Sequence, residues 1–409
     1  MLVRTYTLFC HETGLEFNGR RRLVISGRRG DTSKTMDQDI RAQFPMLEHY
    51  AYLNSAAVSP MPTRAVEAIT SQLRDVAGHG SLHYPQWVAT KDRCRALVAE
   101  MLNVRGDQVA FVRNTSDGFA SIANGLKWRP GDNIVSFDGE FPANFYPWRR
   151  VRDANGVELR LCGEIGGRVD IDTLISMIDA DTRVVALSAV QFASGYRADL
   201  ERVGRAARAV DALFCVDIIQ GFGAMPFDLA AQFVDAACGA SHKWLCAPEG
   251  CGIIYLSDRA RERVEPTLVG WISVEEPWDF ADREQAFKPA ALAWESGTGP
   301  SSLFYGLEQS LTLLHSAGAG RIEAHLAVLS DQICDGLAGR DYEIVSSRLP
   351  GERSQIVCVK HRGGLTSNQV AAELQAHSVI VSPRGDRLRI APHFYNNASD
   401  VEKLLDAMP

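Results

Sequence analysis

Residues 183–217 of the chain, RVVALSAVQFASGYRADLERVGRAARAVDALFCVD, contain two short apolar runs on either side of a helix-like segment. The first run covers residues 183–190 and is rich in valine, and the second covers residues 213–216. The segment between them, residues 199–210, has the apolar spacing of a helix with one buried face. Apolar strands separated by helices are typical of a parallel sheet that is covered on both faces. This stretch therefore predicts a doubly wound α/β domain.

The alternation extends in both directions from this stretch. Further strands are expected at residues 108–113, 133–137 and 252–256, with helices at 90–102 and from 116 onward. The alternation of short apolar strands and helices ends near Pro300. The elements expected beyond it are helices at 302–314, 321–337 and 399–408, and strands around Glu343, Ile356 and Val379 and at 388–390.

Three regions follow from this pattern. Residues 1–35 show no lasting period and are expected to be a disordered extension. Residues 36–299 should form a large, mainly parallel α/β domain, with its first segment partly in the small domain. Residues 300–409 should form a smaller α+β domain.

The bulk composition is that of an ordinary globular protein, with 46% apolar and 23% charged residues. The formal net charge of −7 argues against nucleic acid as a partner, and the basic cluster at residues 20–29 is expected to be a solvated tail. Nine cysteines lie at irregular spacing without a metal-ligand pattern, which indicates free thiols in the cytoplasm and no metal site. The chain has no secretory signal pattern and no apolar run long enough to span a membrane.

Lys243, in the segment Ala240-Ser241-His242-Lys243-Trp244, is the candidate catalytic residue. Its apolar neighbours favour partial burial, which would lower the pKa of the ammonium group. A neutral amine can attack an aldehyde and form a Schiff base. A surface lysine at a turn is the alternative for this pentapeptide alone.

Asp217 ends the apolar strand at 213–216, so its carboxylate should lie at the carboxyl end of that strand. A buried carboxylate needs a cationic partner, and a protonated pyridine nitrogen would serve. Gln220 could donate to a hydroxyl on the same ring. The alternative for Asp217 is a helix cap.

The segment Asn114-Thr115-Ser116-Asp117-Gly118 follows an expected strand and begins an expected helix. Free backbone N–H groups and hydroxyls at a helix N-terminus bind phosphate well. An ordinary Ser/Thr cap is the alternative, and Asp117 is expected to point away from any phosphate. A lysine for an aldehyde, an aspartate for a pyridine nitrogen and a helix N-terminus for a phosphate together predict pyridoxal phosphate as the cofactor.

Seven segments, taken in order, resemble the class V aminotransferase family, which is the cysteine desulfurase-like branch of fold-type-I pyridoxal-phosphate enzymes. They are Tyr52-Leu53-Asn54-Ser55-Ala56-Ala57, Arg113-Asn114-Thr115-Ser116, Glu140-Phe141-Pro142-Ala143-Asn144, Val216-Asp217-Ile218-Ile219-Gln220, Ser241-His242-Lys243, Glu295-Ser296-Gly297-Thr298, and Arg389 ahead of Tyr395-Asn396. Each segment is weakly specific by itself, but the order and spacing over residues 45–405 are specific.

The resemblance implies a role for each matching residue. Lys243 would bind the cofactor covalently, Asp217 would face the pyridine nitrogen, and Phe141 would stack on the ring. The other residues with implied roles are Gln220 at the ring hydroxyl, Thr115, Ser116, His242 and Ser241 at the phosphate, Thr298 at the phosphate of a partner subunit in a homodimer, and Arg389 at the substrate carboxylate. The role of Ser241 is open, because the family often has serine one position earlier, where this chain has Ala240.

A second departure concerns the reaction. Desulfurases place a nucleophilic cysteine shortly before the carboxylate-binding arginine, but residues 379–388 contain none, and Cys334 and Cys358 lie well upstream. Amino transfer on a small amino acid is therefore the first expectation. A lyase that cleaves a C–S or C–C bond, of the cysteine desulfurase, selenocysteine lyase or kynureninase type, is the second, and epimerisation is the third.

These three reactions begin with the same loss of the α proton, so the motifs do not separate them. A pyridoxal-phosphate-binding regulator is a further alternative, but the extension is too short for a DNA-binding domain. Trp271, Trp278, Trp87 and Tyr84 could line a substrate pocket or could pack in a dimer contact. The sequence does not name the substrate.

Overall fold

The computed structural model describes residues 39–409. The expected disordered extension at residues 1–35 and its basic cluster lie outside the described residues.

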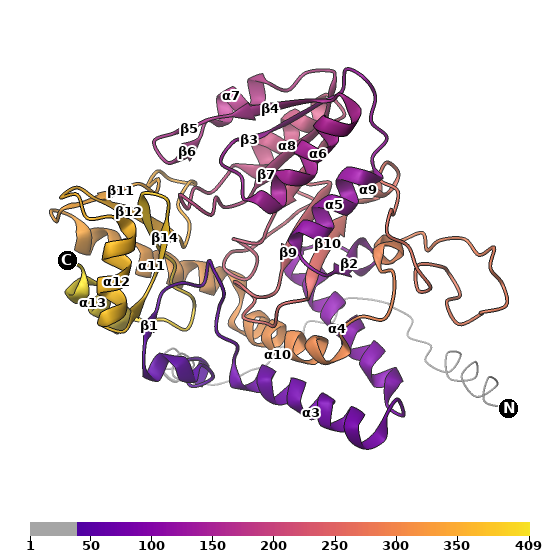
Figure 1. The fold of residues 1–409 in the computed structure, drawn as a ribbon, viewed down its shortest axis with the longest axis horizontal. Helices are drawn as coiled ribbons and strands as arrows, with labels where there is room; N and C mark the ends of the chain where they lie inside the picture. Colours follow the sequence, from indigo (N-terminus) through magenta and orange to yellow (C-terminus); the bar gives the residue numbers. More distant parts are fainter. Residues whose placement is uncertain (1–38) are drawn as a thin grey trace, which may run out of the picture. The chain divides into compact units, whose positions relative to one another are not determined.

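A seven-stranded sheet forms the centre of the large α/β region (Figure 1); it contains the five strands that the sequence predicts there, together with β4 and β9. Its order is β2 (Val109–Val112), β10 (Gly252–Leu256), β9 (Ala236–Ala240), β8 (Leu213–Asp217), β7 (Thr182–Ser188), β3 (Asn133–Phe137) and β4 (Glu158–Cys162). The pairs from β9 to β4 are parallel, which confirms a mainly parallel sheet. The sequence predicted residues 252–256 as one of the parallel strands, and this is wrong in direction. The strand that they form, β10, runs antiparallel to both β9 and β2.

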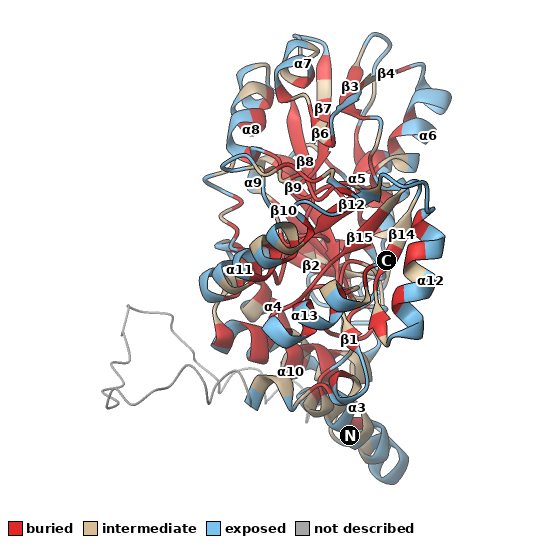
Figure 2. Ribbon diagram, turned by 90° about the vertical axis from the view of Figure 1, so that its left-hand side faces the viewer, coloured by how far each residue is buried: buried red, intermediate tan, exposed pale blue. Residues whose placement is uncertain are grey.

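The two faces of this sheet are both buried, which explains the continuous apolar runs in the sequence. In β8, Phe214 and Val216 belong to one core cluster, whereas Leu213 and Cys215 belong to the other. Helix α8 (Leu200–Ala209) contributes Val203 to the first cluster, and α5 (Thr115–Gly125) contributes Ile122 to the second. Figure 2 shows the strands mainly in the colour of buried residues and the outer sides of helices such as α8 in that of exposed residues.

The remaining helices of this region are α3 (Thr63–His79), α4 (Tyr84–Leu102), α6 (Tyr146–Asn155), α7 (Ile171–Ser176), α9 (Asp258–Arg261) and α10 (Ser301–Ala317). The sequence placed α10 after its domain boundary near residue 300, but this helix packs against α3 and α4. The boundary itself stays a prediction. None of the helices within residues 39–409 is both long enough and apolar enough to cross a membrane.

The C-terminal region contains a second sheet that is antiparallel, in the order β11 (Tyr342–Ile344), β12 (Val357–His361), β15 (Arg387–Ile390) and β14 (Ser382–Arg384). Helices α11 (Ala319–Leu337), α12 (Ser367–Ala376) and α13 (Ala398–Ala407) accompany it. A short parallel pair joins β1 (Ala51–Tyr52) to β13 (Val379–Ile380), so an N-terminal segment lies beside C-terminal elements (Figure 1).

Candidate active site

A cavity of about 590 Å³ lies at the carboxyl end of β8, where open α/β sheets bind their ligands. Loops that follow the strands of the central sheet form most of its wall, and the small sheet adds two arginines. Eight residues that the sequence predicts for the site line this cavity: Thr115, Ser116, Phe141, Asp217, Gln220, His242, Lys243 and Arg389. Ser241 and Thr298 do not line it.

Asp217 is 1% exposed and offers one unused acceptor to the cavity. Its Oδ1 accepts a hydrogen bond from the backbone N–H of Ile219 at 2.8 Å, and its Oδ2 has no hydrogen-bond partner among the described residues. Burial raises the pKa of the carboxyl to about 7, with Glu140 raising it further and Lys243 lowering it. Residues 218–220 form a turn and no helix, so the helix-cap alternative is wrong.

Lys243 is 7% exposed, which rules out the surface-lysine alternative. It follows β9 and precedes β10, and its Nζ lies 5.2 Å from the centroid of the Phe141 ring. Burial lowers the pKa of the ammonium to about 8, against the opposing effect of Asp217. A substantial fraction of this amine is therefore neutral near physiological pH and able to attack an aldehyde.

The N-terminus of α5 points free hydrogen-bonding groups at the same cavity. Asn114 caps the helix, since its side chain accepts from the backbone N–H of Asp117 at 2.9 Å. The expected alternative of a Ser/Thr cap is therefore wrong. Thr115 Oγ1 is buried without a partner among the described residues, and Ser116 lines the cavity beside it.

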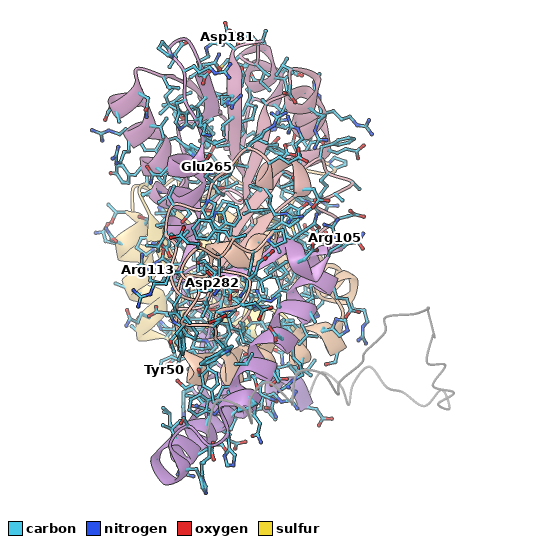
Figure 3. The ribbon with its side chains drawn as sticks, turned by 90° about the vertical axis from the view of Figure 1, so that its right-hand side faces the viewer. Tyr50, Arg105, Arg113, Asp181, Glu265 and Asp282 are labelled. Atoms are coloured by element: carbon cyan, nitrogen blue, oxygen red, sulfur yellow. The ribbon has the colours of Figure 1, made fainter. Side chains whose placement is uncertain are left out.

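Asp117 and His242 are two other titratable residues at the end of the cavity near the α5 N-terminus. The carboxylate of Asp117 pairs with Arg113 at 2.7 Å, and Arg113 is labelled at the surface in Figure 3. Asp117 is thus held away from the anion-binding position. His242 lines the cavity, and burial lowers the pKa of its imidazole. This end therefore suits a phosphate dianion.

Arg389 is a buried guanidinium with free donors. It is 1% exposed, its Nη1 donates to the Phe192 carbonyl at 3.1 Å, and its Nε and Nη2 have no partner within residues 39–409. Burial, together with the charge of Arg384, lowers the pKa of this group to about 10. Such a fork suits a carboxylate of a bound molecule.

Three charged side chains that could compete for Arg389 or with it have partners of their own. Asp400 pairs with Arg41 at 2.7 Å, and Asp386 pairs with Lys360 at 2.8 Å. Arg387 pairs with Glu164. Neither Asp386 nor Asp400 forms a salt bridge with Arg389.

Phe141 and Gln220 lie where a ring could contact them. The Phe141 ring is 38% exposed and packs edge-on against Phe192, with centroids 5.2 Å apart. The Gln220 amide donates to the Ala56 carbonyl at 3.1 Å and accepts from Trp244 Nε1 at 2.9 Å. One N–H of this amide stays available for a ring hydroxyl.

Two expected site residues lie elsewhere. Ser241 is fully buried, and its hydroxyl donates to the Pro248 carbonyl. The phosphate contact that the resemblance implied for Ser241 is therefore corrected, because this residue does not line the cavity. Thr298 is exposed and lines a separate cavity of about 240 Å³. The aromatic residues Trp271, Trp278, Trp87 and Tyr84 line that second cavity too, and not the one that contains Lys243.

Glu140 supports the cavity wall from behind, and the sequence analysis assigned it no role. It is buried and accepts four hydrogen bonds, from the Ser188 backbone N–H at 2.7 Å, the Ser188 hydroxyl, the Gln191 amide at 2.7 Å and the Asn144 amide at 3.0 Å. Its position immediately before Phe141, three residues after the end of β3, was the available signal. Glu140 fixes the loop that carries Phe141.

The free polar atoms of the cavity match the parts of pyridoxal phosphate. Asp217 Oδ2 suits the ring nitrogen, Thr115 Oγ1 and the α5 N-terminus suit the phosphate, and Lys243 suits the aldehyde. The two free donors of Arg389 remain for an amino-acid carboxylate. The described residues therefore fit this cofactor.

Comparison with known proteins agrees with this fit. The model of the Aminotransferase class-V family matches residues 51–404. A probable cysteine desulfurase of Methanothermobacter thermautotrophicus is 27% identical over 393 residues, which covers 90% of this chain and 96% of the relative.

Two solved structures show the same fold. The apo cysteine desulfurase of Thermococcus onnurineus superposes with a TM-score of 0.82 at 24% identity, over 90% of this chain and 96% of that one. The cystine C–S lyase C-DES, in complex with its reaction product cysteine persulfide, has a TM-score of 0.82 at 21% identity, over 89% and 98% of the two chains. At these identities the likeness shows the fold alone.

Proposed function

This chain belongs to the class V aminotransferase family and is a pyridoxal-phosphate-dependent enzyme, and on that premise we propose that it is a carbon–sulfur lyase. Its substrate would be a cysteine derivative, R–S–CH₂–CH(NH₃⁺)–COO⁻. One water is consumed, and the products are the thiol R–SH, pyruvate and ammonium. The sulfur leaves the enzyme with R and is not stored on a protein thiol.

The family relatives support a lyase better than the amino transfer that the sequence favoured first. Relatives that cover about nine-tenths of the chain carry the name probable cysteine desulfurase. Some relatives of similar coverage are named uncharacterized aminotransferases, so amino transfer is the outcome against which the proposal is tested.

The observation that separates the proposed lyase from an enzyme that stores sulfur on its own cysteine is the absence of a thiol at the cavity among the described residues. None of the eight cysteines within residues 39–409 lines it, and all except Cys334 are buried. Residues 379–388, which precede Arg389, contain no cysteine. A transfer of sulfur to the protein would need a thiol that can reach the substrate, and no described residue that lines the cavity has a thiol.

The side chains divide the remaining work. Pyridoxal phosphate, when bound, withdraws electrons from the α-carbon of the amino acid. Asp217 would hold a proton on the ring nitrogen and so maintain that withdrawal. Arg389 would fix the carboxylate with two parallel hydrogen bonds.

Lys243 would take the α proton as general base, because burial lowers its pKa to about 8 and so makes the neutral amine available nearer to neutral pH. The electron pair of the Cβ–S bond leaves with sulfur, which then takes a proton. The 2-aminoacrylate that results is hydrolysed by water to pyruvate and ammonium.

The assembly and the compartment are part of the same proposal. Thr298 lies outside the cavity of its own chain, so a phosphate contact by this residue requires a second subunit, and we propose a homodimer with shared sites. Sedimentation of the active holoenzyme tests this, and an active monomer would contradict it. The eight described free thiols favour a reducing compartment such as the cytoplasm.

A panel of amino acids tests the reaction type. The holoenzyme is incubated with L-cysteine, L-cystine and S-carboxymethyl-L-cysteine, and with L-alanine and L-aspartate as controls without a Cβ–S bond. Pyruvate and a free thiol should appear only with the sulfur compounds. A 2-oxo acid that keeps the intact side chain would instead identify an aminotransferase.

A further inference from the structure

The cavity that contains Lys243 has more positive charge than the cofactor and a simple amino acid require. Arg384, Arg389 and Lys243 all line it, whereas Asp217 is its one acidic side chain. Arg389 suffices for one carboxylate, and the α5 N-terminus with Thr115 is available for a phosphate. Arg384 is therefore left without an anion to bind.

Arg384 has no acidic partner among the described residues. Its Nη1 donates to the neighbouring Pro383 carbonyl at 2.7 Å, and the side chain is half-buried. Burial lowers the pKa of this guanidinium, since the charged form loses solvent without gaining a counter-ion. By contrast, Arg387 on the adjacent strand pairs with Glu164, and Lys360 pairs with Asp386.

The register of the small sheet sets Arg384 beside Arg389. In the antiparallel pair β14–β15, Ser382 lies opposite Arg389 and Arg384 lies opposite Arg387. Since side chains two apart on a strand share a face, Arg384 is the diagonal neighbour of Arg389, at about 7–8 Å between Cα atoms. Two guanidinium groups at this spacing can hold two separate acidic groups of one small molecule.

We propose that Arg384 binds a second acidic group on the substrate, carried by the substituent on sulfur. The inference rests on the proposed carbon–sulfur lyase function and narrows its substrate to cysteine derivatives whose S-substituent is anionic. Arg389 holds the α-carboxylate, and Arg384 holds the acidic end of the group that leaves with sulfur. Phe141 and Phe192 line the same cavity and would give it an apolar surface for the methylene groups between the two acidic groups.

A pair of isosteric substrates tests this assignment on the holoenzyme. S-carboxymethyl-L-cysteine and S-carbamoylmethyl-L-cysteine differ only in an acid and an amide, and they yield mercaptoacetate and mercaptoacetamide with pyruvate and ammonium. Wild type should prefer the acid by about 10-fold or more in kcat/KM, the scale of a charge-assisted bidentate pair. Arg384→Gln should reduce this ratio about 10-fold. Arg387→Gln, the matched control, should leave the ratio at its wild-type value.

Equilibrium binding separates the inference from the reaction type. L-2-aminoadipate and its side-chain amide have CH₂ in place of sulfur, so neither contains a C–S bond, and their dissociation constants are measured by calorimetry. The acid should bind more tightly than the amide, and Arg384→Gln should remove that difference.

The outcomes distinguish two failures. If Arg384→Gln weakened acid and amide equally, Arg384 would be part of the α-carboxylate site or of the fold, and the inference would be overturned. If neither S-substituted cysteine released a thiol while the binding preference for the acid remained, the lyase proposal would fail and the role of Arg384 would stand.

Discussion

Cys358 and Arg389 are direct cross-strand partners, because β12 and β15 pair antiparallel in that register. Cys358 is nevertheless fully buried and does not line the cavity that contains the free donors of Arg389. Burial also raises the pKa of its thiol to about 11, so the nucleophilic thiolate is scarce at neutral pH. We therefore expect no persulfide on Cys358 or Cys334 after turnover with L-cysteine.

Mass spectrometry of the intact holoenzyme checks this first prediction, and Cys358→Ala should retain turnover. A sulfur adduct on either cysteine would show that the chain transfers sulfur to itself, and loss of activity in Cys358→Ala would assign that role to Cys358.

Lys243 should be the single point of covalent cofactor attachment. Lys243→Ala should lose the attachment and the activity while keeping its fold, and reduction with borohydride followed by peptide mapping checks the site in wild type. Cofactor found on another lysine would overturn the assignment. Lys91 is a partly buried lysine that pairs with Glu295, and the peptide that contains it serves as the control that should carry no cofactor.

The same lysine predicts a pH dependence for cofactor attachment. Burial lowers its pKa to about 8 from an ordinary value near 10.5, and only the neutral amine attacks the aldehyde. The rate at which the apoenzyme takes up pyridoxal phosphate should rise about 10-fold per pH unit below pH 8 and level off above it. A rate that kept rising to pH 10 would mean that Lys243 titrates as an ordinary surface lysine.

Asp217→Asn should reduce turnover by on the order of 10²-fold or more, because an amide cannot hold a proton on the ring nitrogen. Cofactor affinity should change far less, since the phosphate site and Lys243 are intact. Measurement of kcat beside the cofactor dissociation constant separates the two effects. Turnover close to wild type would reduce Asp217 to a residue that orders the Ile219 turn.

Arg389→Lys should weaken amino-acid binding by about 2–5 kcal/mol, because lysine lacks the bidentate fork that holds a carboxylate. The spectrum of the holoenzyme without substrate should stay unchanged. A simple amine without a carboxylate should react equally with mutant and wild type. Parallel loss for the amine and the amino acid would make Arg389 structural.

The sequence predicted Lys243 and Asp217, which both line the cavity, because each has a local signal: a motif in one case and the end of an apolar strand in the other. It missed β9, since Ala-Ala-Cys-Gly-Ala lacks the β-branched and aromatic residues that usually mark a strand. The antiparallel direction of β10 could not be predicted from the sequence either, because the direction of a strand in a sheet depends on partner strands far away in the chain.

The choices among similar residues needed tertiary contacts. The resemblance suggested Ser241 as a phosphate ligand, but in the structure its hydroxyl donates to the Pro248 carbonyl, which the following loop places beside it. Arg387 and Arg389 share one face of β15, and Glu164, 223 positions away from Arg387, pairs with that arginine and leaves Arg389 with free donors. No local pattern contains that information.

A complete product balance tests the central claim, carbon–sulfur cleavage without storage of sulfur on the protein, most directly. The holoenzyme is supplied with the fastest cysteine derivative of the panel, and pyruvate, ammonium, free thiol, alanine and protein-bound sulfur are counted in one reaction. We expect one pyruvate and one ammonium for each thiol released, with no alanine and no sulfur on the protein. Alanine with protein-bound sulfur, or a 2-oxo acid that retains the sulfur, would contradict the account.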